Sequence, residues 1–159
     1  MALFSVKTLV LLRSCMLWSM AYFFVKDPTS IAKNGHVIVL AEAMDVPHTY
    51  FRPDDPMTGM IGFFLFMWGF TDLPPLFGDN YVQYLGSIVP IRALAFLCLS
   101  AAGYLTDSPL VSNSVVFSYS FLETMVNIFL YMTLREEENE MSRQNILNTR
   151  EGAQAPREE

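Results

Sequence analysis

Long apolar runs separated by short polar segments dominate the sequence. Four runs are long enough, at about 20 residues each, to cross a bilayer as helices. They cover residues 3–25, 57–77, 87–105 and 114–134. Short joins connect the second run to the third and the third to the fourth, so these runs are expected to pack as antiparallel neighbours. The pattern predicts an all-α membrane protein, a bundle of four transmembrane helices.

A longer polar join separates the first run from the second, and it contains one further helical pattern. Pro28, Thr29 and Ser30 are residues that start a helix, and Pro47 is one that stops it. The segment is too short to span a bilayer. We therefore predict an interfacial helix over about residues 29–45, lying at one end of the bundle; a plain connector is the alternative interpretation.

The polar C-terminal segment divides the chain into a membrane domain, residues 1–134, and a charged tail, residues 135–159. The first half of the tail is expected to continue the fourth helix, whereas the second half is rich in polar residues and is expected to be disordered. An even number of spans places both termini on one side of the membrane. Basic residues beside the spans are nearly equal on the two sides, and the charged tail favours a cytosolic side for the termini.

Composition agrees with a membrane protein, because 52% of the residues are hydrophobic and only 16% are charged. The mean hydropathy is +0.31. The net charge is -6, and seven of the 16 acidic residues lie in the tail. No basic stripe is present, which excludes a nucleic-acid partner. Cys15 and Cys98 lie inside apolar runs, where a thiol is more often a small packing residue than half of a disulfide.

Five polar or charged residues interrupt the predicted spans: Arg13, Asp72, Arg92, Glu123 and Asn127. Asp72 and Arg92 each lie about five residues from the ends of neighbouring antiparallel spans, about 8 Å inside the membrane at 1.5 Å per residue. Arg13 and Glu123 share a deeper level, about 15 Å inside, and Asn127 lies about 10 Å inside. The five residues thus form two layers, a shallower one with Asp72, Arg92 and Asn127 and a deeper one with Arg13 and Glu123. Each layer holds one acid and one base, so we expect Asp72 to pair with Arg92 and Arg13 with Glu123.

Prolines mark the expected helix ends from which these depths are counted. Pro74 and Pro75 are expected to end the second span, and Pro90 to lie in the first turn of the third, where proline is tolerated. The polar layers either lock the helices in one register or hold a lipid headgroup. Arg92 alone has the further option of extending toward the headgroups.

Catalytic and metal-binding patterns are absent from the sequence. His36 and His48 lie twelve residues apart without a neighbouring ligand set, so no metal or other cofactor is expected. No serine lies in a nucleophile motif and no glycine-rich phosphate loop occurs. The sequence therefore favours a protein that is not an enzyme.

Several segments together resemble the fungal "increased loss of mitochondrial DNA" protein family. They are DLPPL (72–76), SIVPIRAL (87–94), ETMVNIFLYMTLREE (123–137) and SIAKNGHVIVLAEAMDVP (30–47), with Arg13 in the first span. The order and spacing of these segments carry the resemblance, which covers most of the chain, roughly residues 13–140.

The resemblance implies a multi-pass protein of the endoplasmic reticulum membrane without known catalysis. Proteins of this kind look like membrane adaptors of bridge-like lipid-transfer proteins, so the expected partners are membrane lipids and a large lipid-transfer subunit. Arg135, Glu136 and Glu137 at the start of the tail are then candidates for docking that partner.

A different function is kept as the alternative, because four-span proteins of this size are able to hold a sterol or another small molecule. Glu123 and Asp72 would then be free acids in an isomerase-like pocket. If both acids are instead bonded to Arg13 and Arg92, neither is available as a general acid. The pairing of these side chains therefore separates the two hypotheses.

Overall fold

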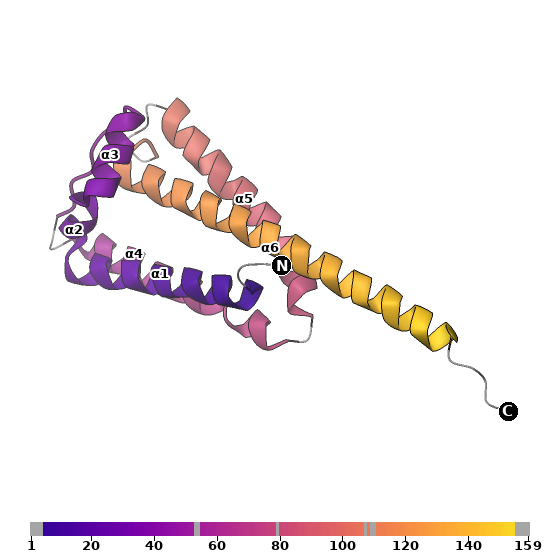
Figure 1. Cartoon of the computed structure of the whole chain (residues 1–159). Helices are drawn as coiled ribbons and strands as arrows, with labels where there is room; N and C mark the ends of the chain where they lie inside the picture. The colour runs from indigo at the N-terminus through magenta and orange to yellow at the C-terminus, as the bar shows by residue number, and fades with distance from the viewer. Residues whose placement is uncertain (1–4, 53–54, 79, 107, 109–110, 155–159) are drawn as a thin grey trace.

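The computed structural model describes residues 5–52, 55–78, 80–106, 108 and 111–154, and in this part of the chain every regular element is a helix. Four of the helices are long and apolar enough to cross a membrane. This confirms the predicted fold class (Figure 1). The elements, in chain order, are α1 (Val6–Lys26), α2 (Pro28–Ala32), α3 (Gly35–Ala43), α4 (Pro56–Thr71), the 3-10 helix η1 (Pro74–Phe77), α5 (Tyr81–Leu105) and α6 (Ser114–Gln154).

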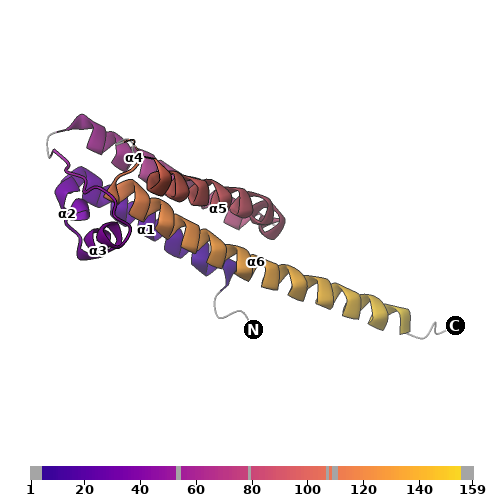
Figure 2. The same ribbon diagram turned by 90° about the horizontal axis from the view of Figure 1, so that it is seen from above.

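The four long helices form two closely packed pairs, α1 with α4 and α5 with α6. Helix α6 also touches α1, which joins the pairs, and α3, which lies across one end of the bundle with α2. Figures 1 and 2 show the other end, where α6 continues far beyond its neighbours. The first turn of α1 lies at that same end, so both ends of the described chain are found there.

Glycines allow α4 to approach α1 closely. A Cβ atom added at Gly62 would lie 2.8 Å from the side chain of Val25 and 3.0 Å from the carbonyl oxygen of Ala21. One added at Gly69 would lie 3.0 Å from the indole nitrogen of Trp18. Small residues at such points let two helix backbones come together, as is common between helices in membranes. The opposite face of α4 is apolar and exposed, as lipid contact requires.

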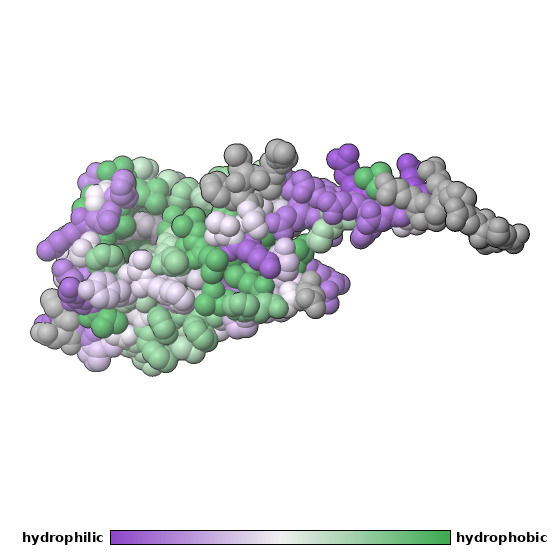
Figure 3. All heavy atoms as spheres, turned by 60° about the horizontal axis from the view of Figure 1, so that its bottom comes forward, coloured by the Kyte–Doolittle hydropathy of each residue, from purple (hydrophilic) through white to green (hydrophobic). Residues whose placement is uncertain are grey.

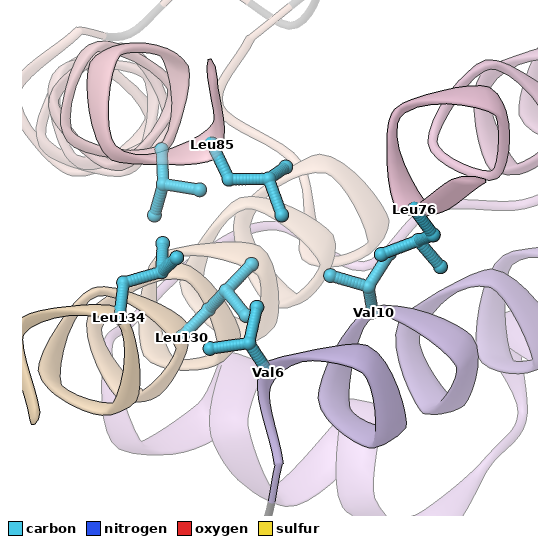
Figure 4. Close-up of a cluster of buried hydrophobic side chains, with 7 residues drawn as sticks. Val6, Val10, Leu76, Leu85, Leu130 and Leu134 are labelled. Carbon is cyan, nitrogen blue, oxygen red and sulfur yellow. The ribbon is translucent and has the colours of Figure 1, made fainter. Parts of the chain in front are cut away.

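The hydrophobic core lies where the two helix pairs meet, at the end from which α6 extends (Figure 4). It draws on α1, η1, α5 and α6, through Val6, Val10, Leu76, Leu85, Val89, Leu130 and Leu134. Many other large apolar side chains remain exposed on the bundle. Figure 3 shows hydrophobic side chains over much of the bundle and hydrophilic ones along the extension of α6.

The expected interfacial helix is two helices, because the chain starts a new helix at Asn34. The side chain of Asn34 accepts a hydrogen bond from the backbone N–H of His36 and so caps α3. Asp27 caps α2 in the same way, accepting from the backbone N–H of Thr29. The hydroxyl of Thr29 also donates to this carboxylate, which lowers the pKa of Asp27.

Helix α3 ends earlier than the expected stop at Pro47. Asp45 adopts a positive φ of 52°, and the backbone N–H groups of Asp45 and Val46 donate to the carbonyls of Glu42 and Ala41. This is the Schellman arrangement, which satisfies the last carbonyls of a helix without proline.

Helix α5 begins at Tyr81, six residues before the expected start, so most of the expected turn over residues 78–86 is helical. Pro90 consequently lies inside the helix, and the expectation that it occupies the first turn is wrong. The α-helical part of the second span ends at Thr71, and Pro74 and Pro75 lie in η1.

Helix α6 continues to Gln154, beyond the point where the tail was expected to become disordered. The residues after Leu134 are rich in Glu and Arg, which favour helix. Extending an existing helix also avoids the unfavourable nucleation step. The remainder of the expected disordered segment, residues 155–159, and residues 3–4 of the first expected span lie outside the described residues.

Candidate functional site: a buried ion-pair network

The structure brings together the five polar residues that interrupt the spans. Arg13 comes from α1, Asp72 from the turn after α4, Arg92 from α5, and Glu123 and Asn127 from α6. The side chains of Arg13, Glu123 and Asn127 are almost fully buried, Asp72 is 4% exposed and Arg92 is 17% exposed. The network therefore lies in the interior, at the junction of the two helix pairs.

Arg13 is the centre of this network. Its Nε donates to Glu123 Oε2 at 2.9 Å and its Nη2 to Glu123 Oε1 at 3.1 Å, a two-point contact between guanidinium and carboxylate. Its Nη1 forms an ion pair with Asp72 Oδ2. The predicted pair of Asp72 and Arg92 is present, with 2.9 Å between Asp72 Oδ1 and Arg92 Nη2. The two expected layers are thus one network, because Arg13 reaches both acids.

Two more groups of α6 bind Glu123. The side-chain amide of Asn127 donates to the backbone carbonyl of Glu123 at 2.7 Å and to its carboxylate at 3.0 Å. The hydroxyl of Tyr119 donates to the same carboxylate at 3.3 Å. Sequence reasoning missed Tyr119, although it precedes Glu123 by one helical turn and that spacing was a usable signal.

The network is electrically balanced, since two arginines face two carboxylates. An isolated charge at the centre of a bilayer is unfavourable by about 2.5–3.5 kcal/mol on insertion scales, and mutual pairing removes much of that penalty. The contacts of Arg13 with Glu123 and of Asp72 with Arg92 both cross from one helix pair to the other. The arrangement can therefore hold the pairs together in one register.

The pairing also bears on acid chemistry at this site. Both carboxylates are held by arginines, so by the criterion set out from the sequence neither Glu123 nor Asp72 is available as a general acid. Among the described residues no three of His, Cys, Asp and Glu are grouped so that they could hold a metal ion.

The tail residues expected to dock a partner differ in their surroundings. Glu137 turns inward: its carboxylate accepts the backbone N–H of Val6 at 2.8 Å and the hydroxyl of Tyr81 at 3.2 Å. It thus caps α1 and ties it to α5 and α6. Arg135 and Glu136 are exposed, and docking by these residues stays a prediction.

Comparison with known proteins places these observations in a family. Residues 4–144 match the family described as increased loss of mitochondrial DNA protein 1. Protein ILM1 of Saccharomyces cerevisiae is 37% identical over 129 residues, which cover 80% of this chain and 63% of the yeast protein. Protein ilm1 of Schizosaccharomyces pombe is 27% identical over 136 residues, or 85% of this chain and 84% of that protein. The match therefore spans less than two thirds of the length of the S. cerevisiae relative. No solved structure matches the chain.

Proposed function

The chain belongs to the family of increased loss of mitochondrial DNA protein 1, and we propose that it is a non-enzymatic adaptor of the endoplasmic reticulum membrane. In this function the four long helices anchor the protein in the bilayer. The extension of α6 docks a large, bridge-like lipid-transfer protein, and the bundle guides phospholipid from the membrane toward that partner.

The observation that carries this proposal is the continuity of α6. The helix has 41 residues, about twice what a bilayer requires. The part after Leu134 extends about 30 Å at 1.5 Å per residue, and its described side chains are mostly exposed and polar or charged. A charged helix that continues from a membrane bundle without a flexible joint is a suitable binding surface for a partner, because little conformational entropy is lost when the partner binds.

The buried network supports the non-enzymatic part of the proposal. Its two acids are each paired with an arginine, and these contacts join the helix pairs. A bundle joined in this way suits a membrane anchor that keeps its shape while phospholipid passes to its partner.

The proposed location of the protein is the endoplasmic reticulum membrane, with both termini in the cytosol. The family resemblance supports the organelle. The shared position of the first turn of α1 and the extension of α6 at one end of the bundle supports placing both termini on one side. Protease treatment of intact microsomes should remove an epitope fused after residue 159, whereas protection of that epitope would place the termini in the lumen.

Affinity purification of the tagged full chain in mild detergent, followed by mass spectrometry, tests the adaptor function. We expect one large lipid-transfer protein at near-stoichiometric amounts. Recovery of the chain alone, with the bundle shown to be folded by size-exclusion chromatography, would contradict the proposal.

A further inference from the structure

A partly polar groove lies between α5 and α6 where α6 leaves the bundle. Its volume is about 270 Å³. Gln83 and Ser87 of α5 face Arg135 and Glu138 of α6 across it, and Pro90 also lines it. It is separate from the buried network, since none of the network residues lines it.

The groove lies at the level of the membrane interface when α5 and α6 cross a bilayer. Arg135 directly follows Leu134, the last residue of the apolar run of α6. On α5, Gln83 and Ser87 precede the apolar stretch that begins at Ile88. Phosphate and amine groups of lipids are found at this depth, and the acyl chains lie below it.

Arg135 supplies a cation with unused donors. Its Nε donates to the hydroxyl of Tyr131 at 3.1 Å and its Nη1 to Glu138 at 3.4 Å, which uses two of the five N–H donors of an arginine. The side chains of Arg135 and Glu138 are 60% and 58% exposed. Such an exposed ion pair contributes little to stability, so a phosphate can take its place on the guanidinium in a two-point contact.

Acceptors for a positive group lie on the same groove. The carboxylate of Glu138 is one. The backbone carbonyl of Gly86 is another, because Pro90 has no N–H and cannot complete the helical hydrogen bond to it. The groove thus offers a cation for a phosphate and two negatively polarised oxygen groups for the positive charge of an ammonium group.

We propose that this groove binds the headgroup of a zwitterionic phospholipid, with Arg135 holding the phosphate and Glu138 and the Gly86 carbonyl facing the ammonium group. The inference deepens the lipid-guiding part of the proposed function and rests on it, since it names the part of the lipid that the bundle holds. The volume admits a headgroup and leaves the acyl chains in the bilayer.

The experiment is a titration of the detergent-purified full chain with dioctanoyl phosphatidylcholine, followed by native mass spectrometry. Dioctanoylglycerol, which has the chains without the headgroup, and inorganic phosphate, which has the anion without the lipid, are titrated in parallel. We expect saturable binding of the phosphatidylcholine only. Equal binding of dioctanoylglycerol would show that the site contacts only acyl chains. Competition by equimolar inorganic phosphate would show that it binds only an anion. Either result overturns the proposal.

Two variants and two matched controls assign the binding to the groove. Arg135→Gln should weaken phosphatidylcholine binding about tenfold, as expected for the loss of a charge-assisted hydrogen bond, whereas Arg143→Gln, also exposed on α6, should not. Gly86→Leu should fill the groove without a backbone clash, because nothing lies within 4 Å of an added Cβ. Gly59→Leu, equally open but on α4, is its control.

Unchanged binding in both Arg135→Gln and Gly86→Leu would overturn the headgroup site. Thermal unfolding of each variant shows whether the bundle is intact. Recovery of the large partner by Gly86→Leu separates this failure from failure of the adaptor function. Gly86 lies on α5 and is not among the candidate docking residues, so the adaptor function predicts recovery whether or not the groove binds lipid.

Discussion

Arg13 holds the buried network together at the scale of single residues. It contacts both acids, whereas Arg92 contacts only Asp72. Removing Arg13 leaves Glu123 without a cation, while removing Arg92 leaves Asp72 still beside Arg13. Because an uncompensated buried charge is more unfavourable than a missing pair, the two arginines are not equivalent.

The first prediction concerns this difference. Arg13→Leu should destabilise the bundle by about 3–5 kcal/mol, the usual effect of breaking a buried pair, and Arg92→Leu should do so by clearly less. Thermal midpoints from fluorescence-detected size-exclusion chromatography in one detergent measure both. A lower midpoint for Arg92→Leu than for Arg13→Leu would contradict the central position of Arg13.

The second prediction uses the balance of the network. Arg92→Leu leaves Arg13 facing two acids, whereas Arg92→Leu combined with Asp72→Leu leaves the neutral pair of Arg13 and Glu123. We therefore expect the double variant to be more stable than the single one. Equal midpoints of the single and double variants would show that Asp72 and Arg92 do not depend on each other.

At the scale of helices, packing of α1 against α4 depends on close approach of their backbones. The N-terminal end of α1 is capped by a residue far along the chain. The first feature rests on Gly62 and Gly69, the second on Glu137, which caps α1 from α6 across 131 positions of sequence. Neither feature is a matter of helix propensity, and each has a matched control in the same helix.

The third prediction compares two glycines of α4. Gly62→Ala should destabilise by about 1–3 kcal/mol, as overpacking does, because its Cβ would press on Val25 and on the Ala21 carbonyl. Gly59→Ala has open space and should stabilise by about 0.5–1 kcal/mol through its helix preference. Chemical unfolding in detergent measures both, and a harmless Gly62→Ala would argue against the close contact.

The fourth prediction concerns the cap of α1. Glu137→Ala removes the acceptor of the Val6 N–H and should destabilise by about 1 kcal/mol, as loss of a helix cap does. Glu136→Ala, its exposed neighbour, should have no measurable effect. Hydrogen exchange at the first turn of α1 provides a local readout; faster exchange in Glu137→Ala alone is the expected result.

The whole molecule consists of a membrane bundle of two helix pairs and a charged helix that projects from one end of it. The family match ends at residue 144, within that projecting helix. If the family shares one partner, its docking surface on α6 lies before residue 144 and on side chains that do not serve the bundle. Glu136 and Glu140 are exposed there, one turn apart on one face.

The fifth prediction follows from this placement. Reversing charge with Glu136→Lys and Glu140→Lys should abolish recovery of the large partner in the affinity purification. A chain that ends after Gln144 should retain it, because the shared surface is intact. Normal recovery with the charge-reversed variant, or loss of recovery with the shortened chain, would place the docking surface elsewhere.

Hydrophobic pattern and charge sufficed to predict the four spanning helices and the pairing of Asp72 with Arg92. Both follow from conditions that any fold of this chain must meet: a bilayer needs long apolar helices, and buried charges need partners. Depth along each helix could be counted from the sequence, which is why residues of opposite charge were assigned to the same level.

Rotation about each helix axis was decided only by tertiary structure. The spans are apolar on nearly every face, so the sequence does not reveal which face turns inward. That Arg13 reaches both acids and that Glu137 turns back to cap α1 both depend on packing between helices distant in sequence. The bilayer requires an apolar pattern that can be read from the sequence, whereas these contacts depend on which side chains the neighbouring helices present.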